Sequence, residues 1–429
     1  MALAVLFAGC TFAGGDVPWP GASPSSGASP SPGGTANGTA PKGTSELPPL
    51  CHRTVPKRSP EPSHPGTLPP VIARVADQVA KVRGLAWEHP VVPEPLTESK
   101  IQKLLSDQAS SEFPEGELAR NGRALITIGV LPAGTDLQKA LIDFGTSQII
   151  GFYDSDTGRL VFVGSTNPTP LETFTLAHEL THALDDQHFD LSRLDRLNAE
   201  CRGDVTTAYT SLAEGDAVEN SVRWAQTYLS SSQLVQLEQE AAGAPNPPAS
   251  VPRFIQDEQE FPYPSGQAFV EALIARGGRA AVNAAFRDPP ISTEQVLHPG
   301  AYPGDLPVDV EVPDLASKLG PEWRDLDRED MGEADISAML HVHLDGSESS
   351  RAAQGWGGGQ YRAWSEGSSH TAVLLETSWD SPADAGRFAD AMRQWLAGRS
   401  TATVEASGSA VTVLFGSDIA SLAALQAAG

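Results

Sequence analysis

The stretch that decides the fold is "LAHELTHALDDQHF", residues 176–189. It places two histidines four residues apart, with a glutamate directly after the first. On an α-helix, residues i and i+4 lie on one face, one turn apart. His178 and His182 can therefore present their imidazoles to one point, and Glu179 leans toward the same point. The alternative is an amphipathic helix that carries surface or capping histidines.

Two imidazoles at this spacing suit a zinc ion, which binds histidine nitrogen at about 2.0–2.1 Å and lowers the pKa of a bound water toward about 7. Glu179 is not needed as a ligand, and it can take the proton of that water. This H-E-x-x-H pattern is the signature of zinc metalloproteases. We predict His178 and His182 as Zn²⁺ ligands and Glu179 as the general base.

The residues before the motif predict how the helix begins. Thr169 is a good N-cap, Pro170 fits the first helical position and Glu172 completes a capping box. The helix should start at Pro170 and run through His182. Upstream, "SQIIGFYDSDTGRLVFVG" (147–164) predicts a β-hairpin, because two apolar runs flank a polar turn.

A catalytic zinc site needs a third protein ligand, and His188 is one candidate. Its spacing matches H-E-x-x-H-x-x-G-x-x-H, but that arrangement needs a glycine where Asp185 stands. If the helix continues, His188 lies about 9 Å beyond His182 along the axis and points off the metal face.

Glu214 is the favoured third ligand. It lies within "LAEGDA" on a second predicted helix, about 204–229, where Gly215 would allow close backbone approach. Two histidines, a glutamate and a water form an established catalytic zinc set. The alternative for Glu214 is a solvated helix carboxylate. Asp216 and Glu219 are candidates to hold a ligand imidazole by its other N–H.

The HELTH segment with a downstream glutamate resembles the gluzincin branch of zinc metallopeptidases. More narrowly, four motifs together are similar to an uncharacterised family of bacterial and archaeal metallopeptidases, many of them lipoproteins: "AHELTHALDDQHFDL", "LAEGDA", "STEQVLHP" and "GWGGGQY". The resemblance spans roughly residues 71–415 and implies a zincin-like fold, without a known substrate. The sequence departs from the gluzincin pattern E-x-x-x-D, because Val218 stands four residues after Glu214, so the usual aspartate is missing or replaced by Asp216.

Other side chains are weaker candidates for the site. His298, in "EQVLHP", could stabilise the oxyanion of a tetrahedral intermediate, as could Tyr263 or Tyr302. Each is otherwise a packed or capping side chain. His341 and His343 alternate as on a half-exposed strand, and "GWGGG" (355–359) is interpreted as a turn anchored by its tryptophan.

The first ten residues, MALAVLFAGC, resemble the end of a bacterial lipoprotein signal, in which Cys10 would be cleaved and lipidated. The run is short and lacks a preceding basic residue, and a frayed apolar terminus is the alternative. Residues 11–70 are rich in Pro, Gly and Ser and predict a disordered tether. Cys51 and Cys201 remain as a possible disulfide pair or as two free thiols.

The composition of the chain restricts the classes of binding partner that we expect. The chain has 429 residues, 40% of them hydrophobic, and a formal net charge of −25 from 29 basic and 54 acidic residues. This negative charge argues against binding to nucleic acid and against electrostatic docking to anionic lipid. We expect an exported protein whose contact with the membrane is the N-terminal lipid anchor alone. The oligomeric state is open.

The predicted fold class is α+β. A mainly helical, zincin-like metallopeptidase domain should cover 71–310, with a β-hairpin or edge strand before the HExxH helix. Strands and a helix after about residue 310 predict a small α+β unit over 311–429.

The expected activity is hydrolysis of peptide bonds in a peptide or protein substrate. Two alternatives remain open: a non-catalytic envelope lipoprotein with a structural or vestigial zinc site, and a zinc amidase acting on cell-wall material.

Overall fold

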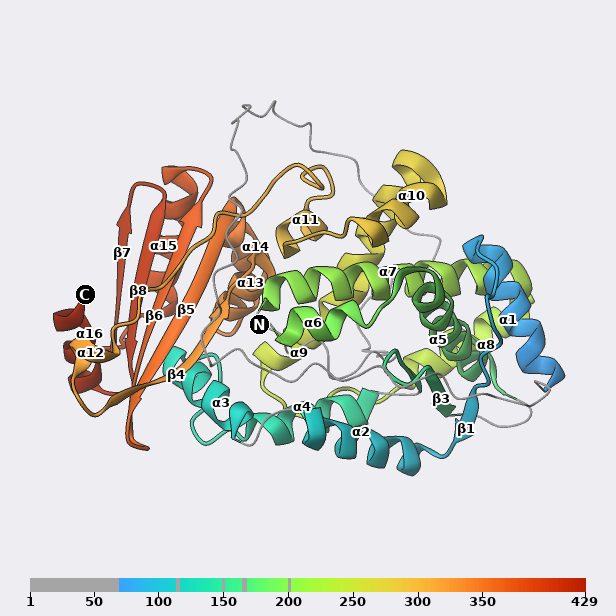
Figure 1. Ribbon diagram of the computed structural model, residues 1–429, viewed down its shortest axis with the longest axis horizontal. Helices are drawn as coiled ribbons and strands as arrows, with labels where there is room; N and C mark the ends of the chain where they lie inside the picture. The colour runs from blue at the N-terminus through green and yellow to red at the C-terminus, as the bar shows by residue number, and fades with distance from the viewer. Residues whose placement is uncertain (1–68, 113–115, 149–150, 164–167, 200–201) are drawn as a thin grey trace.

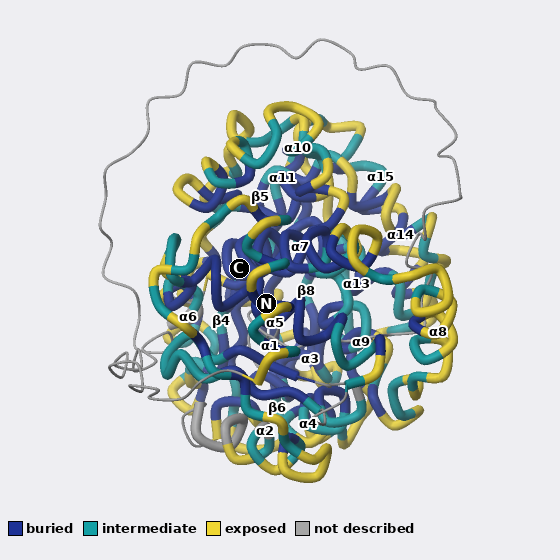
Figure 2. Tube along the Cα trace, turned by 90° about the vertical axis from the view of Figure 1, so that its right-hand side faces the viewer, coloured by how far each residue is buried: buried dark blue, intermediate teal, exposed yellow. Residues whose placement is uncertain are grey.

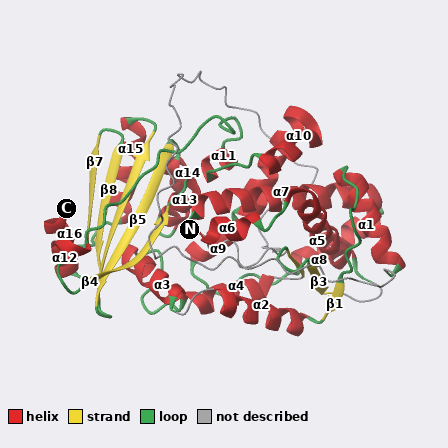
Figure 3. Cartoon of the chain, viewed as in Figure 1, coloured by secondary structure: helices red, strands yellow, loops and turns green. Residues whose placement is uncertain are grey.

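The computed structural model describes residues 69–112, 116–148, 151–163, 168–199 and 202–429. The predicted signal and tether, and with them Cys10 and Cys51, lie outside the described residues, as does Cys201. The chain is a mixed α+β protein, which confirms the predicted class at this level (Figures 1 and 3). Within the described residues, no helix combines the length and the apolar character needed to cross a bilayer.

The first part is mainly helical and contains a small sheet. In chain order its elements are α1 (Pro70–Arg83), β1 (Glu94–Leu96), α2 (Glu98–Glu112), α3 (Glu117–Ile128), α4 (Leu137–Gln148), β2 (Gly151–Asp154), β3 (Arg159–Val163), α5 (Pro170–Phe189), α6 (Arg193–Ala199), α7 (Gly203–Tyr228), α8 (Ser231–Ala242), α9 (Arg253–Glu260), α10 (Pro262–Arg287) and α11 (Thr293–Leu297).

The second part is built on one antiparallel sheet with strand order β4-β5-β6-β8-β7. Its elements are α12 (Ala316–Leu319), β4 (Trp323–Asp330), α13 (Glu333–His341), α14 (Gly346–Ala353), β5 (Trp356–Glu366), β6 (His370–Trp379), α15 (Pro382–Trp395), β7 (Ala402–Ser407), β8 (Ala410–Gly416) and α16 (Ile419–Ala428).

The two parts share a hydrophobic core. Helix α3 of the first part packs on β4, β6 and β8 of the second. Leu125 and Ile128 of α3 belong to the same buried cluster as Tyr361 of β5 and Phe388 of α15. Figure 2 shows this buried interior, with exposed residues confined to the outer turns and helix faces. The C-terminal sheet is thus continuous in packing with the helices.

Helix α5 begins as the sequence predicts. The Glu172 backbone N–H donates to Thr169 Oγ1 at 3.3 Å, and the Thr169 N–H donates to Glu172 Oε2 at 2.9 Å. This reciprocal pair satisfies two backbone donors that the first helical turn leaves open. The helix continues beyond His182 to Phe189, because Asp190 takes a left-handed conformation (φ 57°) only after it.

The predicted hairpin is confirmed as β2 and β3, which pair antiparallel from Gly151 opposite Phe162 to Asp154 opposite Arg159. The small sheet has the order β1-β3-β2, so β2 is an edge strand among the described strands. It packs against α5 at short range. A Cβ added to Gly151 would lie 3.1 Å from Thr175 Cγ2 and 3.3 Å from Glu179 Cγ.

Helices α7 and α10 meet backbone to backbone. A Cβ on Gly215 would lie 2.1 Å from the carbonyl carbon of Gly266, and one on Gly266 would lie 1.9 Å from the carbonyl oxygen of Ser211. Side chains cannot occupy such distances, so both positions require glycine. Gly215 therefore allows a close helix crossing, and its partner is α10.

Two local predictions in the second part are wrong. His341 ends helix α13 and His343 lies in the following turn, rather than on a strand. The apolar residues Ile336, Met339 and Leu340 of this segment are fully buried and recur at helical spacing.

The "GWGGG" stretch is not a turn throughout, because Trp356 opens strand β5. Its glycines make room for neighbouring backbone. A Cβ on Gly358 would lie 2.4 Å from the carbonyl oxygen of Val308, whose N–H donates to the Gly357 carbonyl at 2.6 Å.

Candidate metal centre

Three side chains predicted as ligands converge inside the helical part. His178 Nε2 lies 3.0 Å from His182 Nε2 and 3.1 Å from Glu214 Oε2, and His182 Nε2 lies 3.3 Å from the same oxygen. The exposed fractions are 1% for His178, 3% for His182 and 2% for Glu214. These three residues form a buried group that could hold a metal ion.

The distances between the three ligand atoms fit a cation that is bound in tetrahedral geometry. Donor atoms that bind zinc at about 2.0–2.1 Å in tetrahedral geometry lie about 3.4 Å from one another. The three separations of 3.0–3.3 Å between the donor atoms fall close to this value. Two neutral imidazole nitrogens that face each other can share only one hydrogen between them. A cation between them would instead use both lone pairs and the carboxylate oxygen at once.

The electrostatics of the group are dominated by burial and by mutual charge. Burial lowers the pKa of His178. Burial also opposes protonation of His182, but the Glu214 carboxylate outweighs it and raises the pKa of His182 to about 9. Burial opposes ionisation of Glu214, yet His182 and His178 lower its pKa to about 2. Glu214 is therefore ionised over the physiological range, as an anionic metal ligand must be.

Glu179 lies beside this group. It is fully buried, and its side chain is packed against Gly151 of the edge strand β2. Its charge is also one of the contributions that raise the pKa of His182. Glu179 is thus close both to the ligand group and to β2.

Tyr263 is a second side chain at the group. Its ring centroid lies 6.5 Å from that of His178, with the ring planes 28° apart. Tyr263 is on α10, three residues before Gly266. The close crossing of α10 over α7 is therefore what brings Tyr263 to His178.

The structure keeps His188 away from the ligand group. Because α5 remains helical through Phe189, His188 points elsewhere, and its Nε2 lies 2.8 Å from the carbonyl oxygen of Ala86. Its Nδ1 lies 3.7 Å from Glu88. The geometric argument from the missing glycine at position 185 therefore holds.

Asp216 and Glu219, proposed as partners of a ligand imidazole, contact arginines instead. Two residues along a helix is about 200° around its axis, so Asp216 points away from the side on which Glu214 lies. Asp216 forms ion pairs with Arg83 and Arg279, and Glu219 forms one with Arg223.

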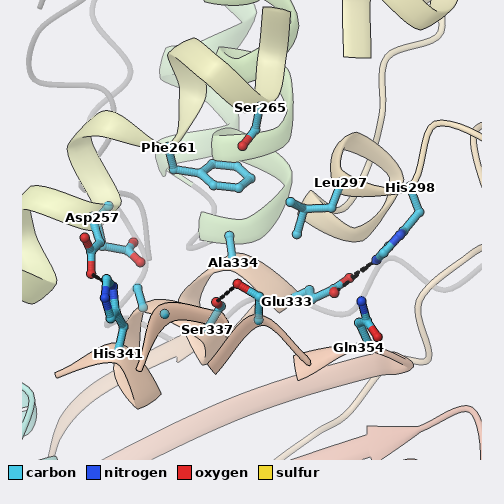
Figure 4. Close-up of a pocket in the computed structure, with 14 residues that line it drawn as sticks. Asp257, Phe261, Ser265, Leu297, His298, Glu333, Ala334, Ser337, His341 and Gln354 are labelled. Atoms are coloured by element: carbon cyan, nitrogen blue, oxygen red, sulfur yellow. Dashed lines mark hydrogen bonds and ion pairs between the residues drawn. The ribbon is translucent and has the colours of Figure 1, made fainter. Parts of the chain in front are cut away.

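His298 contributes to a separate cavity. Its Nε2 lies 3.0 Å from both carboxylate oxygens of Glu333, and its side chain is 42% exposed. The cavity has a volume of about 380 Å³ and lies between α9, α10, α11, α13 and α14. Figure 4 shows the His298–Glu333 pair at one end and the His341–Asp257 pair at the other, with Phe261 and Leu297 between them. None of the three candidate ligands lines this cavity.

Sequence reasoning missed Arg83, the last residue of α1. Its side chain is completely buried and forms ion pairs with Asp185 of α5 and Asp216 of α7. From the sequence, a basic residue before Gly84 is what the C-terminal end of any helix favours. That pattern carries no indication of burial, so no local signal could have identified the contact.

Comparison with known proteins adds one match. Residues 319–426 match a family described as a domain of unknown function, DUF8575. The match covers all five strands of the C-terminal sheet, and the description of the family names no activity. No curated protein and no solved structure matches the chain.

Proposed function

We propose that the protein is an exported, zinc-dependent metallopeptidase of zincin-like fold, tethered to the membrane through a lipid on Cys10. The observation that carries this proposal is the convergence of His178, His182 and Glu214 at 3.0–3.3 Å in a buried position, with Glu179 beside them. A zinc ion held there would polarise a substrate carbonyl and make a water acidic enough to be deprotonated near neutral pH.

Glu179 is proposed as the general base. It takes a proton from the attacking water and returns it to the amine that leaves when the peptide bond breaks. Its burial and its position next to His178 in α5 hold the carboxylate at one place relative to the ligands. We also propose that Tyr263, whose ring lies 6.5 Å from that of His178, donates its phenol hydrogen to the carbonyl oxygen as negative charge develops on it.

The position of the edge strand β2 is an argument for a peptide as the substrate. It pairs with β3 on one side and packs beside Glu179 through Gly151. An extended peptide can add to such an edge through main-chain hydrogen bonds. This arrangement would bring a peptide carbonyl next to the proposed base without requiring a particular side chain.

The test uses the full chain. Metal analysis should find one Zn²⁺ per molecule, and cleavage of casein or of a peptide library should stop on adding a chelator. Glu179→Gln should keep the zinc and lose hydrolysis. Full hydrolysis by that variant would exclude the proposed mechanism.

The burial of the site favours a second candidate, a structural zinc site in a non-catalytic envelope lipoprotein. Exposed fractions of 1–3% for the three ligands are typical of closed structural sites as well. In that case Glu179→Gln would leave every property except local electrostatics unchanged, and the wild type would cleave no peptide. Release of products from peptidoglycan without proteolysis would point instead to a cell-wall amidase.

A further inference from the structure

We propose that Arg83 is a positioning residue for the metal centre, which holds the two ligand-bearing helices α5 and α7 at the spacing that the cation requires. This inference rests on the proposed metal site and goes beyond it, because Arg83 itself is not a ligand. It assigns a role in metal binding to α1, the first helix of the described chain.

Arg83 bridges the two helices that carry the ligands. Its Nε lies 3.0 Å from Asp185 Oδ1 and also contacts Asp216 Oδ2. Asp185 follows His182 by one turn of α5, and Asp216 follows Glu214 on α7. A single guanidinium therefore ties the helix that holds the histidines to the helix that holds the glutamate.

The guanidinium is itself held by further contacts. Its Nη1 donates to Asn283 Oδ1 of α10 at 2.7 Å. Its Cζ lies 5.7 Å from the ring centroid of Phe189 and 5.8 Å from that of Phe286, and these two rings stack at 4.7 Å. The aromatic pair helps to exclude water, which strengthens the ion pairs and restricts the movement of the arginine.

Arg279 provides a natural comparison. Its Nη1 lies 2.6 Å from Asp216 Oδ1 and its Nη2 donates to Asn220 Oδ1 at 3.2 Å. Both partners are on α7, and its side chain is 20% exposed. Among the described residues, Arg83 is the cation whose ion pairs reach both α5 and α7. Arg279 shares the Asp216 contact but does not bridge the helices.

Loss of Arg83 should act on the ligands through helix position. Asp185 would then lose the arginine that pairs with it, Asp216 would keep only Arg279, and the helices would separate to let water reach the buried carboxyl groups. His178, His182 and Glu214 would no longer meet at tetrahedral spacing. Because zinc binding needs the three donor atoms placed together, the affinity for Zn²⁺ should fall.

The experiment measures metal binding in the full chain and does not depend on turnover. The Zn²⁺ dissociation constant is obtained by competition with a chromophoric chelator, and the visible absorption of the Co²⁺-substituted protein reports coordination geometry. Arg83→Met should weaken Zn²⁺ binding by roughly 10- to 100-fold and change the Co²⁺ spectrum, whereas Arg279→Met should change affinity less than about threefold.

A second control separates positioning from stability. Arg362 is a buried arginine of β5 that pairs with Asp325 of β4, in the C-terminal sheet. Arg362→Met should lower the unfolding temperature but leave the Zn²⁺ affinity and the Co²⁺ spectrum unchanged. If Arg83 acted only through general stability, both variants would behave alike, and the proposal would fail.

Two further outcomes complete the test. If Arg83→Met does not fold, the Arg83→Lys variant tests the positioning role instead. Lysine has a carbon at the position of the arginine Nε, which contacts both aspartates, so this variant should weaken Zn²⁺ binding while near-ultraviolet circular dichroism stays native. A folded Arg83→Lys or Arg83→Met with wild-type affinity and spectrum overturns the inference. Absence of Zn²⁺ binding by the wild type would instead remove the metal site on which both proposals stand.

Discussion

Glu214 Oε2 of α7 lies 3.1 Å from His178 Nε2 of α5, although 36 residues separate them in the chain. The contact exists because α7 packs along α5, and because Thr181 of α5 accepts a hydrogen bond from Asn220 of α7 at 2.9 Å. This relationship turns a histidine pair on one helix into a three-residue metal site.

Removing the carboxylate should abolish tight metal binding. Glu214→Gln keeps the size of the side chain but removes the negative charge from the ligand set. Loss of a residue that only hydrogen-bonds to a metal ligand can lower affinity by roughly 100-fold. We expect loss of the ligand Glu214 itself to lower the Zn²⁺ affinity by at least this much. Metal analysis after dialysis measures this. Glu219→Gln is the matched control, because Glu219 is also buried on α7 but pairs with Arg223. Equal zinc content in both variants would remove Glu214 from the ligand set.

Zinc should stabilise the folded protein, since the three ligands come together only on folding. At a free Zn²⁺ concentration of about 100 times the dissociation constant, the gain in unfolding free energy is about 2.7 kcal/mol. A chelator should therefore lower the unfolding temperature of the wild type and leave that of His178→Ala almost unchanged. An identical shift in both proteins would show that the chelator acts elsewhere.

The crossing of α7 and α10 should tolerate no side chain. Gly266→Ala would place a Cβ 1.9 Å from the Ser211 carbonyl oxygen, so we expect a loss of about 1–3 kcal/mol or more in unfolding free energy. Gly386 is the control. It lies within α15 with nothing within 4 Å of an added Cβ, so Gly386→Ala should stabilise by about 0.5–1 kcal/mol. Urea unfolding of both variants tests the opposite signs.

Asp204 predicts a pH dependence of stability. Burial, with the nearby charges of Asp330 and Asp335, raises the pKa of Asp204 to about 8, even though its Oδ1 accepts hydrogen bonds from the Thr293 N–H and hydroxyl. An aspartate in the unfolded chain has a pKa of about 3.9. Between these values the folded protein holds a proton that the unfolded chain has released, so Asp204 makes stability fall as the pH rises from about 4 toward 8.

Asp204→Asn should remove this slope. The amide oxygen can still accept from Thr293, but the side chain no longer ionises. The variant should match the wild type near pH 4 and exceed it at pH 8, with a difference that grows by at most ~1.4 kcal/mol per pH unit. Urea unfolding at several pH values measures the difference. A constant offset across this range would show that Asp204 does not titrate there.

Much of the local structure could be read from the sequence. The capping box at Thr169 and the motif predict α5 from Pro170 through His182, and the apolar runs around 154–158 predict the β2–β3 hairpin. These features depend on hydrogen bonds and side-chain periodicity within a few residues, which a sequence displays directly. The sequence also favoured Glu214 over His188 as the third ligand, because a continuing helix carries His188 off the metal face and two histidines with a glutamate form an established zinc set.

The tertiary structure alone decided the surroundings of that site. The sequence by itself determined which side chains can ligate a metal: two histidines on one face of a helix and a glutamate on the next. Only the packing of α1 and α10 on those helices placed Arg83 between Asp185 and Asp216 and brought Tyr263 to His178. Contacts between segments distant in the chain depend on how helices cross. A crossing is decided by the shape and volume of all the packed side chains together, including the absence of any at Gly215 and Gly266.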